Sequence, residues 1–123
     1  MIKSLFIIWM GSGIGGVLRF VVQNLAVKYY QTFFPVGTFL VNIIGCFLIG
    51  LFFGISEKQG WMTSEWRFFL ITGICGGFTT FSSFSYDGIS LLRQGDYFYF
   101  AAYLILSVGL GLVATFVGNM IIK

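Results

Sequence analysis

The chain has 123 residues, of which 58% are hydrophobic, 20% aromatic and only 9% charged, and it contains no histidine. Soluble domains carry about 25% charged residues, so this composition excludes a soluble globule, and a mean hydropathy of +0.94 excludes a disordered segment. An integral membrane protein is predicted, without histidine-based catalysis or the commonest metal ligand.

The charged positions divide the chain into four long apolar stretches. Residues 29–56, 68–86 and 97–122 carry no charge, and residues 4–27 contain only Arg19. A membrane-spanning helix needs about 20 mostly apolar residues, and these stretches lack the alternation of barrel strands. The sequence therefore predicts an all-α integral membrane protein, with a single domain over residues 1–123. Its four transmembrane spans are expected near residues 4–27, 36–56, 66–92 and 97–121.

The first span contains a glycine pair and one charge. Gly11 and Gly15 form a G-x-x-x-G row, which favours close approach between membrane helices. Arg19 lies well inside the span, where a charge is costly. One interpretation is a structural side chain that snorkels or pairs with a helix C-terminal carbonyl, and the other is an anion-attracting charge at a pore mouth. No A-x-A-like cleavage site follows, so we expect the span to be retained.

The second span opens after Pro35 and contains one amide, Asn42. Proline is tolerated in the first turn of a helix. The Asn42 side chain supplies two donors and one acceptor. It either joins helices by a hydrogen bond or donates to a desolvated anion, and the sequence leaves both interpretations open.

Glycines and hydroxyl side chains interrupt the third span over residues 73–85. The G-G-F-T-T run predicts a break near the middle of this helix, because glycine weakens a helix interior by about 1 kcal/mol. A broken membrane helix exposes backbone polar groups, which are tolerated only inside protein or along a cavity. After the break, Phe81 and Phe84 share a helical face. Their rings could contact an anion through positive edges, or they could be core residues.

Small and polar residues recur every four positions along the fourth span: Tyr103, Ser107, Gly111, Thr115 and Asn119. At that spacing they share one face, which we expect to lie against a protein neighbour or a pore. Cys46 and Cys75 fall in separate spans and are interpreted as small hydrophobic residues. No catalytic constellation is present, so an enzyme is not expected, and neither is a nucleic-acid partner.

Four spans place both termini on one side of the membrane, and the basic residues are divided almost evenly between the two sides. One side carries Lys3, Lys58, Arg67 and Lys123; the other carries Lys28 and Arg93, with Arg19 if it is counted there. Orientation follows an excess of Lys and Arg on the cytoplasmic side. Because the excess is weak, insertion in both orientations is our hypothesis.

The motifs of these spans resemble those of the small bacterial fluoride channels, the Fluc or CrcB family. The resemblance covers nearly the whole chain and is carried by Gly15 with Arg19, by residues 37–45 (G-T-F-L-V-N-I-I-G) and by residues 73–84 (G-I-C-G-G-F-T-T-F-S-S-F). It implies a fluoride-selective channel of the bacterial inner membrane that passively exports fluoride from the cytoplasm. It also implies an antiparallel, dual-topology homodimer with two pores.

By motif position, the resemblance further implies site residues. A structural sodium ion at the dimer centre would be held by the backbone carbonyls of Gly76 and Thr79. Gly111 departs from the pattern, since relatives often carry serine there, and Asp87 stands where relatives often have glutamate in a vestibule. The implied fluoride pore is lined by Asn42, Phe81, Ser82, Ser83, Phe84, Tyr103, Ser107 and Thr115.

Small multidrug transporters are a second class of protein with about this length, four spans and dual topology. Small multidrug transporters resemble one another in a membrane-embedded glutamate in the first span, and this chain has no acid before Glu57. A structural or assembly subunit without transport is the third alternative.

Overall fold

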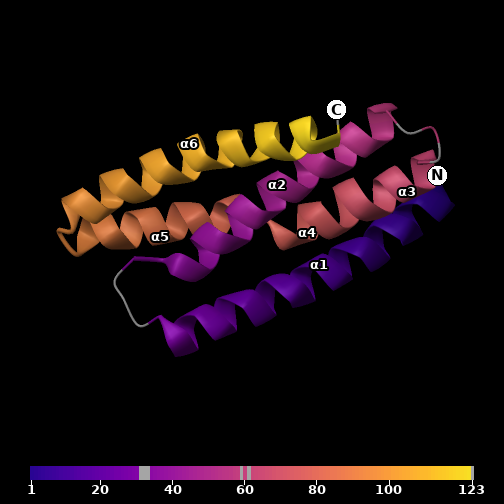
Figure 1. Cartoon of the computed structure of the whole chain (residues 1–123). Coiled ribbons are helices and arrows are strands. Elements are labelled where there is room, and N and C mark those ends of the chain that lie inside the picture. Colours follow the sequence, from indigo (N-terminus) through magenta and orange to yellow (C-terminus); the bar gives the residue numbers. More distant parts are fainter. Residues whose placement is uncertain (31–33, 59, 61, 123) are drawn as a thin grey trace.

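The computed structural model describes residues 1–30, 34–58, 60 and 62–122, so Lys123 lies outside the described residues. Four helical segments run along the length of the molecule, and the chain reverses direction from each to the next (Figure 1). They are α1 (Ile2–Tyr29), α2 (Val36–Lys58), a composite third span (Ser64–Arg93) and α6 (Tyr97–Ile122). Each is long and apolar enough to cross a membrane. The predictions of an all-helical protein and of four spans are confirmed.

The third span is built from four pieces: α3 (Ser64–Arg67), the wide π-helical segment η1 (Phe68–Cys75), α4 (Gly76–Phe78) and α5 (Phe81–Arg93). Between α4 and α5, Thr79 and Thr80 have extended backbones, with ψ angles of 157° and 118°. The Thr80 hydroxyl then accepts the Ser83 N–H at 3.1 Å and caps α5. The predicted break in the third span is therefore confirmed.

The break sends the two halves of the third span to different neighbours. η1 and α4 pack along α1, whereas α5 lies beside α6 (Figure 1). Gly11 and Gly15 lie at the first contact, where an added Cβ on Gly15 would overlap the Ile74 carbonyl. This glycine row therefore packs helices of one chain together at backbone distance.

The other close contact joins α2 and α6. A Cβ on Gly50 would overlap the Thr115 carbonyl, and one on Gly118 would overlap the Phe47 carbonyl. We call this contact the α2–α6 seam, defined by Gly50, Thr115, Gly118 and Asn119.

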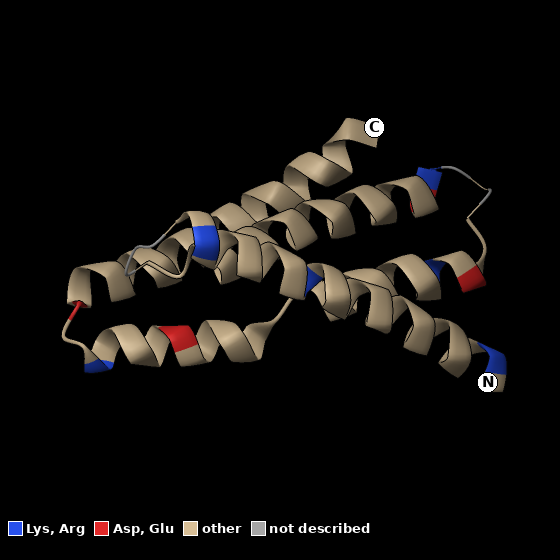
Figure 2. Cartoon of the chain, turned by 90° about the horizontal axis from the view of Figure 1, so that it is seen from below, with Lys and Arg blue, Asp and Glu red and all other residues tan. Residues whose placement is uncertain are grey.

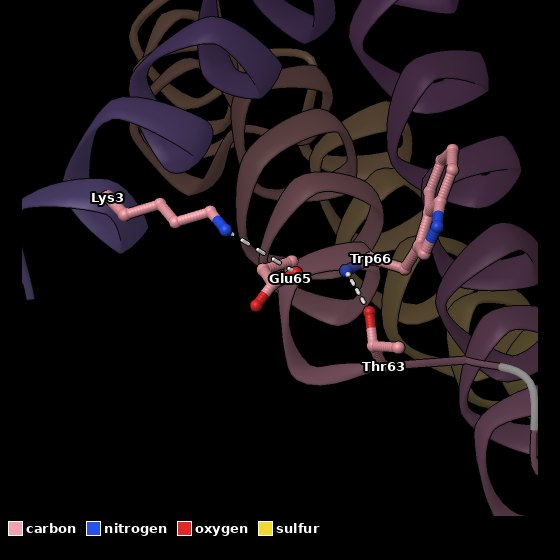
Figure 3. Close-up of polar contacts among 4 residues, drawn as sticks. All are labelled: Lys3, Thr63, Glu65 and Trp66. Atoms are coloured by element: carbon pink, nitrogen blue, oxygen red, sulfur yellow. Dashed lines mark hydrogen bonds and ion pairs between the residues drawn. The ribbon is translucent and has the colours of Figure 1, made fainter.

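Most charged residues lie near the ends of the helices (Figure 2). At the end that holds the N-terminus, the Lys3 ammonium lies 3.9 Å from the Glu65 carboxylate, and Thr63 caps α3 by accepting the Trp66 N–H (Figure 3). The two charged side chains are largely exposed, and such pairs contribute at most about 1 kcal/mol. Arg19 and Asp87 are the charged residues that lie further inside the helices.

Candidate functional site

Asn42 on α2 binds the backbone at the break in the third span. Its amide oxygen accepts the Thr80 N–H at 2.8 Å, and its amide nitrogen donates to the Thr80 carbonyl at 3.0 Å. The oxygen and the nitrogen of the Asn42 amide are thus paired with the backbone N–H and carbonyl of Thr80. The amide retains a second N–H that this pairing does not use.

The break leaves two backbone carbonyls without their helical donors. In a continuous α-helix, the carbonyls of Gly76 and Thr79 would accept the N–H groups of Thr80 and Ser83. Here the Thr80 N–H binds Asn42, and the Ser83 N–H binds the Thr80 hydroxyl. The carbonyls of Gly76 and Thr79, which the resemblance implies as sodium ligands, are therefore not bound by these two N–H groups.

A third carbonyl of the break is bound by Arg19. The Arg19 Nε donates to the Gly77 carbonyl at 3.2 Å, and the side chain is half-buried. The structure thus places Arg19 at a helix C-terminal carbonyl, one of the two interpretations drawn from the sequence. Charge at this end of α4 also complements the helix dipole.

The aromatic residues after the break lie together on α5 and reach α6. The ring centroids of Phe81 and Phe84 are 5.6 Å apart, and those of Phe84 and Tyr103 are 5.1 Å apart. Phe81 is 79% exposed, whereas Phe84 is half-buried. Ser82 is exposed and within 3.1 Å of the Thr80 hydroxyl, and Ser83 is half-buried.

Two hydroxyls of α6 keep their hydrogen-bonding capacity. Tyr103 is fully buried, and neither its hydroxyl nor that of Ser107 has a hydrogen-bond partner among the described residues. The Asp87 carboxyl and the Thr38 hydroxyl are the polar side chains that interact with the Tyr103 hydroxyl, outside the geometry of a direct hydrogen bond. Buried polar groups are rarely left unpaired in proteins. These two hydroxyls are therefore the best-placed donors for a ligand.

Thr115 lies further along the same stripe of α6, and its hydroxyl is engaged differently. It is 3.1 Å from the Cys46 carbonyl and 3.1 Å from the Gly111 carbonyl, and it can donate its single proton to either one. Asn119 donates to the Gly50 carbonyl at 3.3 Å. The stripe thus divides into two hydroxyls without a partner among the described residues, those of Tyr103 and Ser107, and two paired side chains in the α2–α6 seam, those of Thr115 and Asn119.

A cavity of about 610 Å³ lies where α1 ends and α2 begins. Asp87, Thr38 and Gln23 contribute to its wall, with Tyr30 and Phe34 among the aromatic residues around them. Gln23 donates to the Thr38 hydroxyl at 3.3 Å. The sequence prediction did not include Gln23 or Thr38, although an amide one helical turn after Arg19 was an available signal.

The break in the third span offers backbone oxygens as candidate cation ligands. Within the described part of the chain, no group of three or more Cys, Asp or Glu residues could hold a metal ion. The two carbonyls at the break would suit a hard cation that prefers oxygen, as unwound carbonyls do for sodium in transporters.

A small four-span protein with a broken helix and polar groups collected at the break has the architecture of membrane channels and transporters. The comparison with known families agrees, and the chain belongs to the CrcB family. The model of that family, described as CrcB-like protein, Camphor Resistance (CrcB), matches residues 6–119.

Curated relatives extend over nearly the whole chain. A protein of Flavobacterium psychrophilum named fluoride-specific ion channel FluC is 50% identical over 98% of both chains. Proteins of the same name are 42% identical in Azobacteroides pseudotrichonymphae, over 98% of this chain and 97% of the relative, and 43% identical in Phocaeicola vulgatus, over 94% and 95%. The family consists of ion channels, and this member is not an enzyme.

Proposed function

We propose that this chain is a fluoride-selective channel that exports fluoride passively from the cytoplasm across the bacterial inner membrane. The observation that carries the proposal is that the hydroxyls of Tyr103 and Ser107 on α6 are buried and have no hydrogen-bond partner among the described residues. It is supported by relatives named fluoride-specific ion channels along the full length of the chain.

The chemistry of the cluster suits a small, strongly hydrated anion. Each water hydrogen bond that fluoride loses must be replaced by a donor, and the uncommitted N–H of Asn42 and the hydroxyls of Tyr103 and Ser107 offer such donors. Ring edges of Phe81 and Phe84 add partial positive charge. The Arg19 side chain, which lies inside the first span, donates to the Gly77 carbonyl. Weak, distributed binding of this kind lets an ion leave as well as enter.

Direction would come from the membrane potential. Moving one charge through 100 mV releases about 2.3 kcal/mol, so a negative cell interior drives the anion outward through an open path. No second substrate is required for this step. The alternative of a proton-coupled multidrug transporter has no support from an acid in the first span, since residues 1–56 contain no Asp or Glu.

An antiparallel homodimer with two pores is the assembly that we propose. Gly76, Ser82 and Ser85 are exposed in the middle of the third span, and Phe81 is exposed beside them. In a single chain these polar groups would face lipid, which is costly, whereas a second copy would cover them. The weak charge bias between the two sides supports an inverted orientation of that copy.

A sodium ion at the dimer centre is the structural cofactor that we propose. Each chain offers the carbonyls of Gly76 and Thr79, and two chains would offer four oxygens. Gly76 is exposed, so a second copy can approach it. When bound, the ion would supply positive charge that holds four partially negative carbonyls together.

Expression in bacteria that lack their own fluoride exporter tests the proposed function. We expect growth in fluoride medium to be restored and the intracellular fluoride concentration to fall. Phe81→Ile, expressed to the same level, is the matched control and should not restore growth. Equal fluoride accumulation with and without the wild-type chain would contradict the proposal, and resistance to cationic drugs alone would favour the transporter alternative.

A further inference from the structure

We infer that Asn42 is a positioning residue for the cation site as well as a pore donor: it keeps the Gly76 carbonyl available by binding the Thr80 N–H. The inference rests on the proposed sodium site. In this role, Asn42 holds the backbone at Thr80 before any ion binds.

The first step is the competition for one N–H group. Gly76 precedes Thr80 by four residues, the spacing at which a helical carbonyl accepts an N–H. The Asn42 oxygen lies 2.8 Å from the Thr80 nitrogen and takes that hydrogen bond instead. The Asn42 nitrogen donates to the Thr80 carbonyl at 3.0 Å, which fixes which edge of the amide faces the N–H. Asn42 therefore opposes closure of the helix over the break.

The second step is that the neighbouring residue is anchored independently. The Thr79 hydroxyl donates to the Cys75 carbonyl at 3.0 Å, and its methyl group occupies the space that a side chain at Gly45 would need. The Thr79 carbonyl loses its own helical donor to the Thr80 hydroxyl. Asn42 thus controls one of the two carbonyls, and Thr80 controls the other.

The third step links the cation site to the anion path. An asparagine amide has one oxygen and two N–H groups. The oxygen and one N–H are used at Thr80, which leaves one N–H for an anion. A single side chain would therefore hold the backbone for sodium and contribute a donor to fluoride, so the two roles can be separated by changing one end of the amide.

The test measures thermal unfolding of the full-length protein in detergent, in sodium chloride and in N-methylglucamine chloride of equal ionic strength. Wild type should be stabilised specifically by sodium. Asn42→Leu, which removes the acceptor, should raise the sodium concentration for half-maximal stabilisation about tenfold or more, the effect of roughly 1.4 kcal/mol of lost binding free energy.

Two further variants separate this role from a general loss of packing. Asn42→Asp keeps an oxygen that accepts the Thr80 N–H but loses the donor to the Thr80 carbonyl. Sodium stabilisation should therefore persist, at a lower overall unfolding temperature, while fluoride flux in liposomes falls. Asn119→Leu removes an amide of the same kind from the α2–α6 seam and should leave the sodium response unchanged.

The outcomes distinguish the inference from the proposal beneath it. No sodium-specific stabilisation of wild type would remove the proposed sodium site. Stabilisation of Asn42→Leu equal to that of wild type would overturn the inference and leave the sodium site standing. If Asn42→Leu does not fold, Asn42→Asp decides, because loss of its sodium response contradicts the inference.

Discussion

The α2–α6 seam and the break in the third span use the same kinds of residue in opposite ways. In the seam, Asn119 donates to the Gly50 carbonyl of α2, and the Thr115 hydroxyl lies 3.1 Å from the carbonyls of both Cys46 and Gly111. Gly50 brings the two backbones into contact. Earlier on α6, where the Tyr103 ring lies against Phe84 just after the break, the hydroxyls of Tyr103 and Ser107 have no partner among the described residues, although Tyr103 is fully buried.

This difference shows that a polar residue type in a membrane span does not by itself define a role. Thr115, Ser107 and Tyr103 lie on one stripe of one helix, at a spacing of four residues. These three hydroxyls differ in the groups that face them from the neighbouring helix. In the seam, the backbone of α2 comes close enough to offer a carbonyl to Thr115. The hydroxyls of Tyr103 and Ser107 have no such acceptor among the described residues, and we interpret these free donors as the means of binding an anion.

The largest expected effect is loss of the seam. Gly50→Leu would drive a side chain into the Thr115 backbone, and since backbone cannot move aside as a side chain can, folded protein should not be recovered. Gly109→Leu on α6 is the matched control, because an added Cβ there has open space. Recovery of both variants as equal monodisperse peaks in size-exclusion chromatography would contradict the described contact.

The next effect concerns the aromatic residues at the break. Phe81→Ile and Phe84→Ile remove ring edges from the proposed anion path, and each should lower fluoride flux about tenfold or more, equivalent to roughly 1.4 kcal/mol in barrier height. The dimer should stay intact in size-exclusion chromatography. Unchanged flux would reassign both residues to packing.

Arg19 should affect stability more than permeation. Arg19→Met removes the donor to the Gly77 carbonyl while keeping an apolar stem, and hydrogen bonds to charged groups contribute about 1.5–3 kcal/mol. We expect a lower unfolding temperature with most of the flux retained in the folded fraction. Abolished flux at unchanged stability would instead support an anion-attracting role.

The smallest expected effect distinguishes the Ser107 hydroxyl from the Thr115 hydroxyl. Ser107→Ala removes a buried hydroxyl without a partner, so it should lower fluoride flux without lowering the unfolding temperature. Thr115→Val removes the hydrogen bond to the Cys46 or Gly111 carbonyl and should cost about 0.6 kcal/mol, with a smaller loss of flux. The reverse order of the two fluxes would place Thr115, and not Ser107, nearer the anion.

The sequence sufficed for the features that depend on local chemistry. Charge-free runs predicted the four spans, and adjacent glycines and threonines predicted the break. The partners of polar side chains were not predictable, because helical spacing identifies a shared face and not the element that it meets. The pairing of Asn42 with Thr80 joins residues 38 positions apart, and that of Thr115 with Cys46 joins residues 69 apart. Dimerisation, sodium and the pore residues stay predictions.

Ion efflux from liposomes that contain the purified wild-type chain tests the central claim most directly. The fluoride and chloride that leave the liposomes are measured with ion-selective electrodes. A potassium ionophore is added to start efflux, because it lets potassium ions leave and balance the charge of the anions. The proposed function predicts rapid fluoride efflux with chloride retained, and efflux that falls in Phe81→Ile and Phe84→Ile. Absence of passive fluoride efflux, or equal efflux of both anions, would contradict it.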